Sequence, residues 1–149
     1  MIIKDLNQSH INEILKIEEV NYIEPWDYKI FVDEIVNSPN SEYFGLFDND
    51  DNIIAYLGFW KLPDYLDITN VSVDPDYKRQ GIATILLNEL ERRALDYETP
   101  SIFLEVNVNN LAAINLYKKH GYKELKRIKN YYSRLRQDAY LMQKEINNE

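Results

Sequence analysis

The chain has 149 residues, of which 45% are hydrophobic, and its formal net charge is −8. This length suits one domain with a normal buried core, so we expect a single domain over residues 1–149. The absence of cysteine excludes disulfides, thiolate metal sites and a cysteine nucleophile, and it is typical of a reducing cytoplasm. Because the chain has only two histidines, we do not expect a histidine-rich metal site. The acidic net charge disfavours nucleic-acid binding. The apolar runs are too short to span a membrane.

The N-terminal region predicts one strand and two helices. Residues 2–4 read as a short strand, and Ser9 is expected to cap a helix over about 10–20, where apolar residues recur at helical spacing. Asp27 is expected to cap a second helix that extends to about Val36.

Three strands of a meander follow, at residues 43–47, 53–61 and 66–73. The first two are joined by the polar turn 48–52, and Pro75 ends the third because proline cannot donate to a strand ladder.

The second half of the chain alternates helices and strands. The expected elements are a helix over 82–96, a strand over 102–108, a helix over 111–120 with Asn109 or Asn110 as its cap and Gly121 after its end, and strands over 122–128 and 139–145. The order β-α-α-β-β-β-α-β-α-β-β predicts an α/β fold with a mixed, mostly antiparallel sheet of six to seven strands and about four flanking helices.

The loop 78–84 runs from a strand directly into a helix. Backbone N–H groups near a helix N-terminus bind phosphate well, and a single glycine allows the backbone to approach such a ligand. The loop lacks the Gly-Lys-Ser/Thr of a P-loop and the glycines of a dinucleotide fingerprint. It therefore predicts either a pyrophosphate site formed by Arg79, Gln80, Gly81, Ile82, Ala83 and Thr84, or an ordinary turn and helix start.

Three polar residues in the second half are candidates for chemistry. Glu105 lies in an apolar strand, where it would serve as a general base with a raised pKa, face solvent, or pair with an arginine. Tyr117 would donate a proton to a leaving group or be a core aromatic residue. Asn110 would bind a ligand or cap the helix that follows it.

Tyr131 and Tyr132 follow a predicted strand and are expected on a loop. Their rings and hydroxyls would line a substrate cleft or pack within the turn, and the sequence pattern leaves both interpretations open.

Together these segments resemble the GNAT superfamily of acetyl-CoA-dependent N-acetyltransferases. Val71-Ser72-Val73-Asp74-Pro75 followed by Lys78-Arg79-Gln80-Gly81-Ile82-Ala83 is similar to the coenzyme A motif of that superfamily. The finer resemblance is to the ribosomal-protein-alanine N-acetyltransferases (the RimI type). It rests on Leu104-Glu105-Val106, Asn110, Ala112-Ala113-Ile114, Leu116-Tyr117, Gly121-Tyr122, Asn130-Tyr131-Tyr132 and Asp138-Ala139 with Met142.

The resemblance implies a role for each candidate residue. Glu105 would be the proton acceptor and Tyr117 the proton donor. Backbone groups of Val71, Ser72, Val73 and the loop 79–84, together with Asn110, would bind acetyl-CoA. Asn107 and Gln137 depart from the family, which commonly has an arginine and an acidic residue there.

The function implied is direct acetyl transfer to the N-terminal α-amine of a protein, a ribosomal protein with N-terminal alanine in the finer resemblance. The peptide is expected between the loop after the first helix and the Tyr131 segment. A small-amine acetyltransferase, a non-catalytic acyl-CoA-binding protein and an interaction module without a cofactor are the alternatives. We expect a cytoplasmic monomer or weak dimer, without metal, nucleic-acid or membrane partners.

Overall fold

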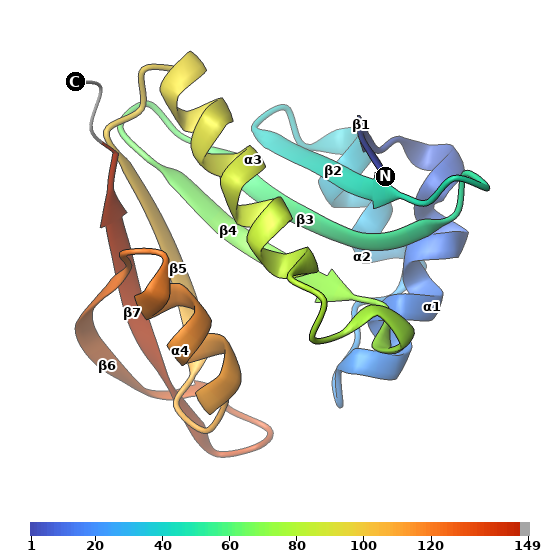
Figure 1. Ribbon diagram of the computed structural model, residues 1–149. Coiled ribbons are helices and arrows are strands. Elements are labelled where there is room, and N and C mark those ends of the chain that lie inside the picture. Colours follow the sequence, from blue (N-terminus) through green and yellow to red (C-terminus); the bar gives the residue numbers. More distant parts are fainter. Residues whose placement is uncertain (147–149) are drawn as a thin grey trace. The chain divides into compact units, whose positions relative to one another are not determined.

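Figure 1 shows a computed structural model of the chain, which describes residues 1–146. Helices and strands follow one another almost as the sequence pattern predicts. In chain order the elements are β1 (Ile2–Asp5), the 3₁₀ turn η1 (Gln8–His10), α1 (Ile11–Asn21), α2 (Tyr28–Val32), the π-helical turn η2 (Asp33–Asn37), β2 (Ser41–Phe47), β3 (Ile53–Lys61), β4 (Leu66–Val73), the 3₁₀ turn η3 (Pro75–Tyr77), α3 (Ile82–Asp96), β5 (Ser101–Asn107), α4 (Leu111–Lys119), β6 (Lys123–Tyr132) and β7 (Gln137–Glu145).

The strands form a seven-stranded sheet in the order β1-β2-β3-β4-β5-β7-β6. The pairs β1–β2, β2–β3, β5–β7 and β6–β7 are antiparallel, whereas β4 and β5 are parallel. This architecture confirms the predicted α/β fold with its mixed, mostly antiparallel sheet. Backbone contacts divide the chain into two compact units, and the divisions fall within β4 and within α3. The expectation of a single domain stays a prediction.

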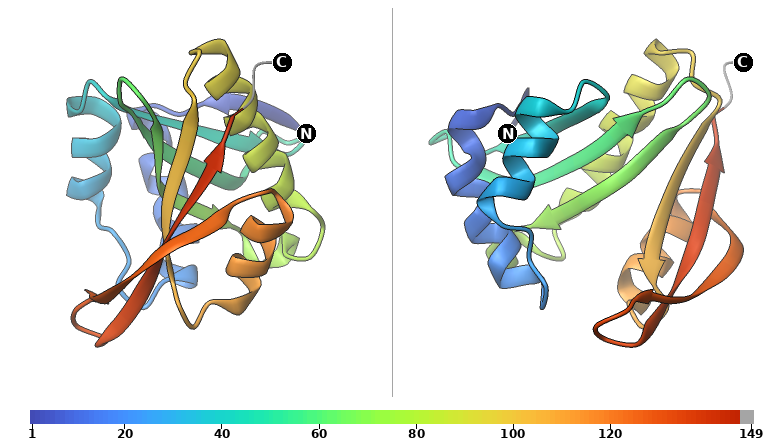
Figure 2. Two further views of the ribbon diagram at one scale, coloured as in Figure 1. Left: turned by 90° about the vertical axis from the view of Figure 1, so that its left-hand side faces the viewer. Right: turned by 180° about the vertical axis from the view of Figure 1, so that it is seen from behind.

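The first unit comprises residues 1–61 and 69–89. Within it, α1 and α2 cover one face of β2 and β3, and the beginning of α3 covers the opposite face (Figure 2). A cluster of buried side chains fills the space between the strands and α1 and α2. Its members are Leu6, Ile11, Ile14, Ile17, Phe31, Tyr43, Phe47, Ile53 and Tyr56. The isoleucines of α1 thus form the predicted buried stripe.

A buried carboxylate lies among these apolar residues. Glu18 of α1 is only 2% exposed. Its oxygens accept hydrogen bonds from the Tyr56 hydroxyl at 2.6 Å, the Asn70 amide at 2.8 Å and the Trp26 backbone N–H at 3.0 Å. These three donors satisfy the carboxylate, and they connect α1 to β3, to β4 and to the segment before α2.

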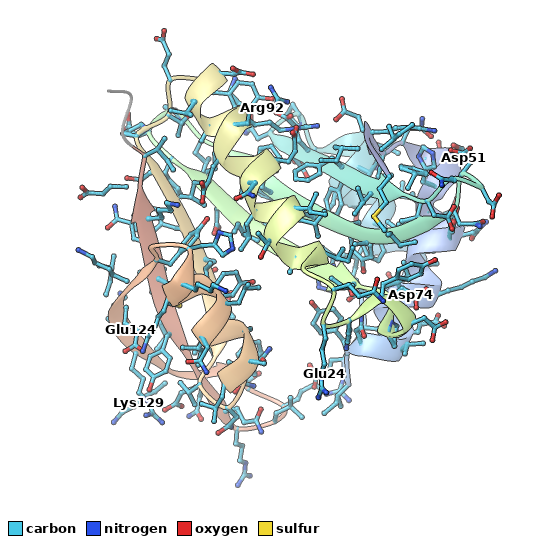
Figure 3. All side chains as sticks on the ribbon, viewed as in Figure 1. Glu24, Asp51, Asp74, Arg92, Glu124 and Lys129 are labelled. Carbon is cyan, nitrogen blue, oxygen red and sulfur yellow. The ribbon has the colours of Figure 1, made fainter. Side chains whose placement is uncertain are left out.

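The second unit comprises residues 62–68 and the chain from Leu90 onward. Within it, α4 lies on one face of β5, β7 and β6 (Figure 2). The Lys118 ammonium of α4 lies 3.1 Å from the Glu124 carboxylate of β6, a residue labelled in Figure 3. Apolar side chains of the strands and of α4 are buried here. They include Ile102, Leu104, Val106, Ile114, Tyr117, Ala139 and Met142.

Local chemistry explains most of the helix ends. The Asp27 carboxylate accepts a hydrogen bond from the Ile30 N–H at 2.9 Å, and the Asn110 side chain accepts one from the Ala113 N–H at 3.2 Å, so both predicted caps are confirmed. Gly121 follows the end of α4 with a φ of 92°, a conformation that glycine adopts without steric cost.

The predicted cap at Ser9 is wrong. Asn7 takes that role for η1, because its side-chain oxygen accepts from both the Ser9 N–H at 2.9 Å and the Ser9 hydroxyl at 2.6 Å. The helix α1 begins two residues later, at Ile11. The helix expected to extend to Val36 also ends early, since α2 stops at Val32 and continues as the π-helical turn η2.

The loop expected at Tyr131 and Tyr132 is a second error. Strand β6 continues through both tyrosines to Tyr132, which pairs with Gln137 at the start of β7. The register shifts between Ile128 and Tyr132, where Asn130 adopts a φ of 52°. The irregular backbone at Asn130 resembles a strand end in the sequence, but the ladder resumes after it.

Candidate active site

A hollow of about 350 Å³ opens on the second unit, beside the parallel pair β4–β5. Its lining residues come from β4 and the residue before it, from β5 and from β7. They are Tyr65, Asp67, Phe103, Glu105 and Leu141. Asp67 lies opposite Phe103 in the β4–β5 register, and Glu105 lies opposite Leu141 in the β5–β7 register. Because alternate residues of a strand share a face, Phe103 and Glu105 both line the hollow.

Glu105 is neither fully buried nor fully exposed on this face of β5. Burial raises the pKa of its carboxyl above the ordinary value, because a partly desolvated carboxylate is disfavoured relative to the neutral acid. Within residues 1–146 no arginine forms an ion pair with it. The alternative of an arginine partner therefore loses its support, and a carboxyl with a raised pKa in a hollow has the properties of a general base.

Tyr117 lies on α4 and is 9% exposed. Burial, and to a smaller extent Tyr132, raise the pKa of its hydroxyl to about 12. Its ring contacts the Tyr122 ring edge-on, with centroids 5.7 Å apart. The hydroxyl therefore stays protonated throughout the physiological range and is available as a hydrogen-bond donor.

Tyr131 and Tyr132 lie at the end of β6 with their ring centroids 5.0 Å apart. Tyr131 is 47% exposed. Burial is the main cause of the raised pKa of each hydroxyl, and the Glu105 carboxylate adds to both shifts. The two tyrosines thus share the electrostatic environment of Glu105, although a role in substrate binding stays a prediction.

The two positions that depart from the resembled family contact one another. The Asn107 amide donates a hydrogen bond to the Gln137 side-chain oxygen at 2.5 Å, from the end of β5 to the start of β7. Where the family commonly has an arginine and an acidic residue, this chain has two neutral amides. In this chain the hydrogen bond between the two amides links the end of β5 to the start of β7 without charge.

The side chain of Asn110, a candidate residue for binding acetyl-CoA, already has a structural role. Its oxygen caps α4, so only its amide N–H groups are left to donate to acetyl-CoA. This is the helix-cap alternative, and the predicted contact with the cofactor stays a prediction.

The segment 78–84 belongs to the first unit, and its last three residues form the start of the 15-residue helix α3. Arg79 and Gly81 have φ values of 66° and 74°, and the Gly81 carbonyl accepts the Ile85 N–H at 3.3 Å. A Cβ atom at Gly81 would meet no atom within 4 Å, so the space beside the loop is open. A residue with positive φ beside one with ordinary φ can turn successive N–H groups toward one side, an arrangement that binds anions. The residues present therefore fit a phosphate group.

The carbonyl groups at the end of β4 already have partners from α1 and the residue after it. The Tyr22 hydroxyl donates to the Val71 oxygen at 2.5 Å, and the Asn21 amide donates to the Val73 oxygen at 2.8 Å and to the Ser72 hydroxyl at 2.6 Å. The predicted contacts of Val71, Ser72 and Val73 with acetyl-CoA therefore depend on their N–H groups or on shared carbonyls.

Sequence reasoning missed Asp67, which lines the hollow with Glu105. The signal was present: Asp67 stands between buried Leu66 and Ile68, in the same pattern as Glu105 between Leu104 and Val106. In the described part of the chain, no group of three or more His, Cys, Asp or Glu side chains could hold a metal ion. Also within residues 1–146, no helix has the length and apolar content needed to cross a membrane.

Comparison with known proteins identifies the family. Residues 10–122 match the model of the acetyltransferase (GNAT) family. The chain belongs to the GNAT acetyltransferase family. It is 32% identical over 148 residues to the [ribosomal protein bS18]-alanine N-acetyltransferase of Escherichia coli strain K12, covering 94% of each chain. An N-alpha-acetyltransferase of Saccharolobus solfataricus is 30% identical over 157 residues, covering 97% of this chain and 92% of the relative.

Solved structures give the same result. The crystal structure of the ribosomal-protein-S18-alanine N-acetyltransferase from Escherichia coli superposes with a TM-score of 0.90 at 30% identity, covering 98% of this chain and 94% of that chain. This GNAT acetyltransferase is therefore similar to that enzyme in fold and in sequence over nearly its whole length, as the motifs predict.

Proposed function

We propose that this GNAT acetyltransferase transfers the acetyl group of acetyl-CoA to the N-terminal α-amine of a protein, and that a ribosomal protein with N-terminal alanine is its substrate. The likeness to the Escherichia coli ribosomal-protein-alanine enzyme carries this proposal, because it extends over 94% of each chain in sequence and is matched by a TM-score of 0.90. The hollow that contains Glu105 supports it.

Glu105 would act as the general base. An N-terminal amine has a pKa near ~8, so at neutral pH most of it is protonated and cannot attack a carbonyl carbon. A carboxylate must take this proton, and burial that raises the pKa of Glu105 also makes it a stronger base. The acidic surface expected from the net charge of −8 would attract a basic N-terminal segment.

Tyr117 would protonate the departing thiolate. The pKa of about 12 keeps the hydroxyl protonated until the carbon–sulfur bond breaks. An ordinary thiol has a pKa of about 8.5, below that of Tyr117, so a thiolate alone is a weaker base than the Tyr117 phenolate. The hydroxyl therefore acts first as a hydrogen-bond donor to the sulfur, and the proton follows as negative charge develops.

The loop 78–84 would hold the pyrophosphate of acetyl-CoA through its backbone N–H groups, with Lys78 and Arg79 adding positive charge. Replacement of Gly81 by Val tests this role. The positive φ of 74° disfavours a branched side chain, and a Cβ there would enter the open space beside the N–H groups. We expect the KM for acetyl-CoA to rise about tenfold, by the ~1–2 kcal/mol cost of this backbone conformation, with less change in the KM for peptide.

The function is tested with peptides. The enzyme is incubated with acetyl-CoA and short peptides that begin with alanine and contain one internal lysine, and mass spectrometry locates the acetyl group. We expect acetylation at the α-amine only. Peptides with a blocked N-terminus and spermidine serve as controls, since turnover of spermidine alone would favour a small-amine substrate. Binding of coenzyme A without any turnover would favour the non-catalytic alternative. The cytoplasmic location, the oligomeric state and the lack of nucleic-acid or membrane partners stay predictions.

A further inference from the structure

Asp67 has an unusual environment for an acidic residue. It is the second residue of β4, and its neighbours Leu66 and Ile68 are buried. One carboxylate oxygen, Oδ1, is itself buried and has no hydrogen-bond partner among the residues that the structure describes. An unpaired buried polar atom costs free energy, so the Asp67 carboxylate calls for an explanation.

The partner of Asp67 in the hollow is Glu105. The register sets Asp67 opposite Phe103, two residues before Glu105 on the same strand and the same face. The hollow of about 350 Å³ is also lined by Leu141 and by the rings of Tyr65 and Phe103, which meet edge-on with centroids 5.2 Å apart. Two carboxyl groups therefore line a space with mainly apolar and aromatic walls.

The charges around this space are negative or neutral. Burial, followed by repulsion from Glu105, raises the pKa of Asp67 to about 7. Tyr131 of β6 interacts with both carboxylates, Tyr132 of β6 with Glu105, and β7 contributes Leu141. Neither carboxylate has a cationic partner within residues 1–146. A cation that enters the hollow would reduce the repulsion between the Asp67 and Glu105 carboxylates and would give the Asp67 carboxylate a hydrogen-bond donor.

We propose that Asp67 binds the substrate's α-ammonium group, so that Asp67 and Glu105 together recognise the free N-terminus. This inference rests on the proposed function. The Asp67 carboxylate, which lines the hollow, accepts one N–H of the ammonium group, while Glu105 accepts the proton that leaves. The hollow thereby selects a protonated primary amine over a neutral or blocked N-terminus, and the aromatic walls contact the first side chain.

The proton balance of the reaction is complete. One N–H bond of the ammonium group breaks, and Glu105 takes that proton. The nitrogen lone pair forms the C–N bond as the C–S bond breaks, and the sulfur takes the proton of Tyr117. The second proton lost by nitrogen restores Tyr117, and Glu105 releases its proton to solvent. Asp67 changes no bond order and acts by holding the nitrogen.

A pair of peptides isolates this role. One peptide begins with alanine and is acetylated by the wild-type enzyme; its twin carries a propionyl group in place of alanine and so lacks only the amine. Both are titrated calorimetrically at pH 7 in the presence of coenzyme A, which prevents turnover. The ratio of the two Kd values reports recognition of the ammonium group alone.

We expect Asp67→Asn to reduce the preference for the amino peptide about tenfold, since a charge-assisted hydrogen bond is lost, while the Kd of the propionyl twin changes less than twofold. Asp67→Glu should restore part of the preference. The matched control is Asp64→Asn, which removes the same charge from an exposed residue just before β4 and should leave the ratio unchanged.

Two outcomes separate this inference from the proposed function. If alanyl peptides are acetylated but Asp67→Asn leaves the ratio unchanged, Asp67 does not bind the ammonium group. If the wild-type enzyme acetylates no alanyl peptide, both proposals fail. Two controls distinguish a folding defect from lost recognition. A misfolded Asp67→Asn protein would unfold at a lower temperature, and it would also bind the propionyl peptide more weakly.

Discussion

Two buried carboxyl environments in this chain differ in what surrounds them. Glu18, in the first unit, is 2% exposed and accepts hydrogen bonds from three donors. Asp67 and Glu105, in the second unit, line a hollow, and Asp67 Oδ1 has no partner in the described chain. A satisfied carboxylate holds elements together, whereas an unsatisfied one keeps its binding capacity for a substrate. The hydrogen-bond partners of a buried acid, rather than its burial, therefore indicate its use.

The largest expected effect is on catalysis at Glu105. Replacement by Gln keeps the shape but removes the base, and we expect kcat to fall roughly 10²–10⁴-fold. The free energy of unfolding should change little or increase, because Gln removes a partly buried charge that burial disfavours. Steady-state kinetics and urea unfolding measure the two quantities. If Glu105→Gln lost as much stability as Glu18→Ala, the Glu105 carboxylate would have a structural role like that of Glu18, which would contradict the comparison.

The rate should also depend on pH in a definite direction. Glu105 must be ionised to accept a proton, so we expect kcat, measured at saturating peptide where binding by Asp67 does not limit the rate, to fall as the pH drops through the pKa of Glu105. Because burial raises this pKa, the loss should begin at a higher pH than for an ordinary glutamate. Glu105→Gln should abolish this acidic limb. An unchanged acidic limb in that variant would assign the base to another group.

Removal of the Glu18 carboxylate should affect stability strongly. Glu18→Ala leaves the Tyr56 hydroxyl, the Asn70 amide and the Trp26 N–H without their acceptor, and we expect a loss of about 3 kcal/mol in the free energy of unfolding. Glu18→Gln should cost less, since an amide oxygen still accepts. Denaturant titration measures both variants. Equal stability of Glu18→Ala and wild type would show that the network contributes nothing.

Tyr56→Phe should have a smaller effect on the same network. It removes one buried hydroxyl, which donates to Glu18 at 2.6 Å, while the other two donors remain. We expect a loss of about 1–2 kcal/mol, which is a decrease in Tm of roughly 2–8 °C for a chain of this length. Tyr131→Phe, at a tyrosine that is 47% exposed, is the matched control and should change Tm by less.

An effect of similar size and opposite sign is expected at Asp67, where substitution should increase stability. Its folded pKa of about 7 exceeds the unfolded value, so the folded state binds more protons and loses stability as the pH rises toward 7. Asp67→Asn removes this penalty. We expect a gain of about 1–2 kcal/mol at pH 8 after allowance for solvent screening, and almost none at pH 4. Thermal unfolding at both pH values measures it, and a gain independent of pH would contradict the raised pKa.

Local patterns predicted most elements of this fold. The bounds of β3, β4 and α3 agree with expectation, because each combines a continuous apolar pattern with a clear end such as Pro75 or the Gly81 turn. The caps at Asp27 and Asn110 agree for the same reason, since a cap contacts residues two or three positions away. Ser9 failed because Asn7 is an equally good cap two residues earlier.

The errors at Tyr131 and Tyr132 had a different origin. Strand β6 continues through them because β7 supplies the ladder, and the pair Tyr132–Gln137 forms after an irregular residue, Asn130. A window along the sequence detects the irregularity but contains no information on the partner strand. Context of this kind overrides local propensity in sheets.

The order of elements, the family motifs and the candidates Glu105 and Tyr117 follow from local sequence patterns. The hydrogen-bond partners of the acids do not, because Glu18, Asp67 and Glu105 all stand beside apolar residues in the sequence and only packing distinguishes them. The donors to Glu18 from Tyr56 and Asn70 lie 38 and 52 residues away along the chain. Asp67 approaches Glu105 through the register of β4 with β5. Hydrogen-bond partners at such separations are set by how strands and helices pack, so the packing gave Glu18 three donors and placed Asp67 and Glu105 in a hollow, where we propose that they act on the substrate.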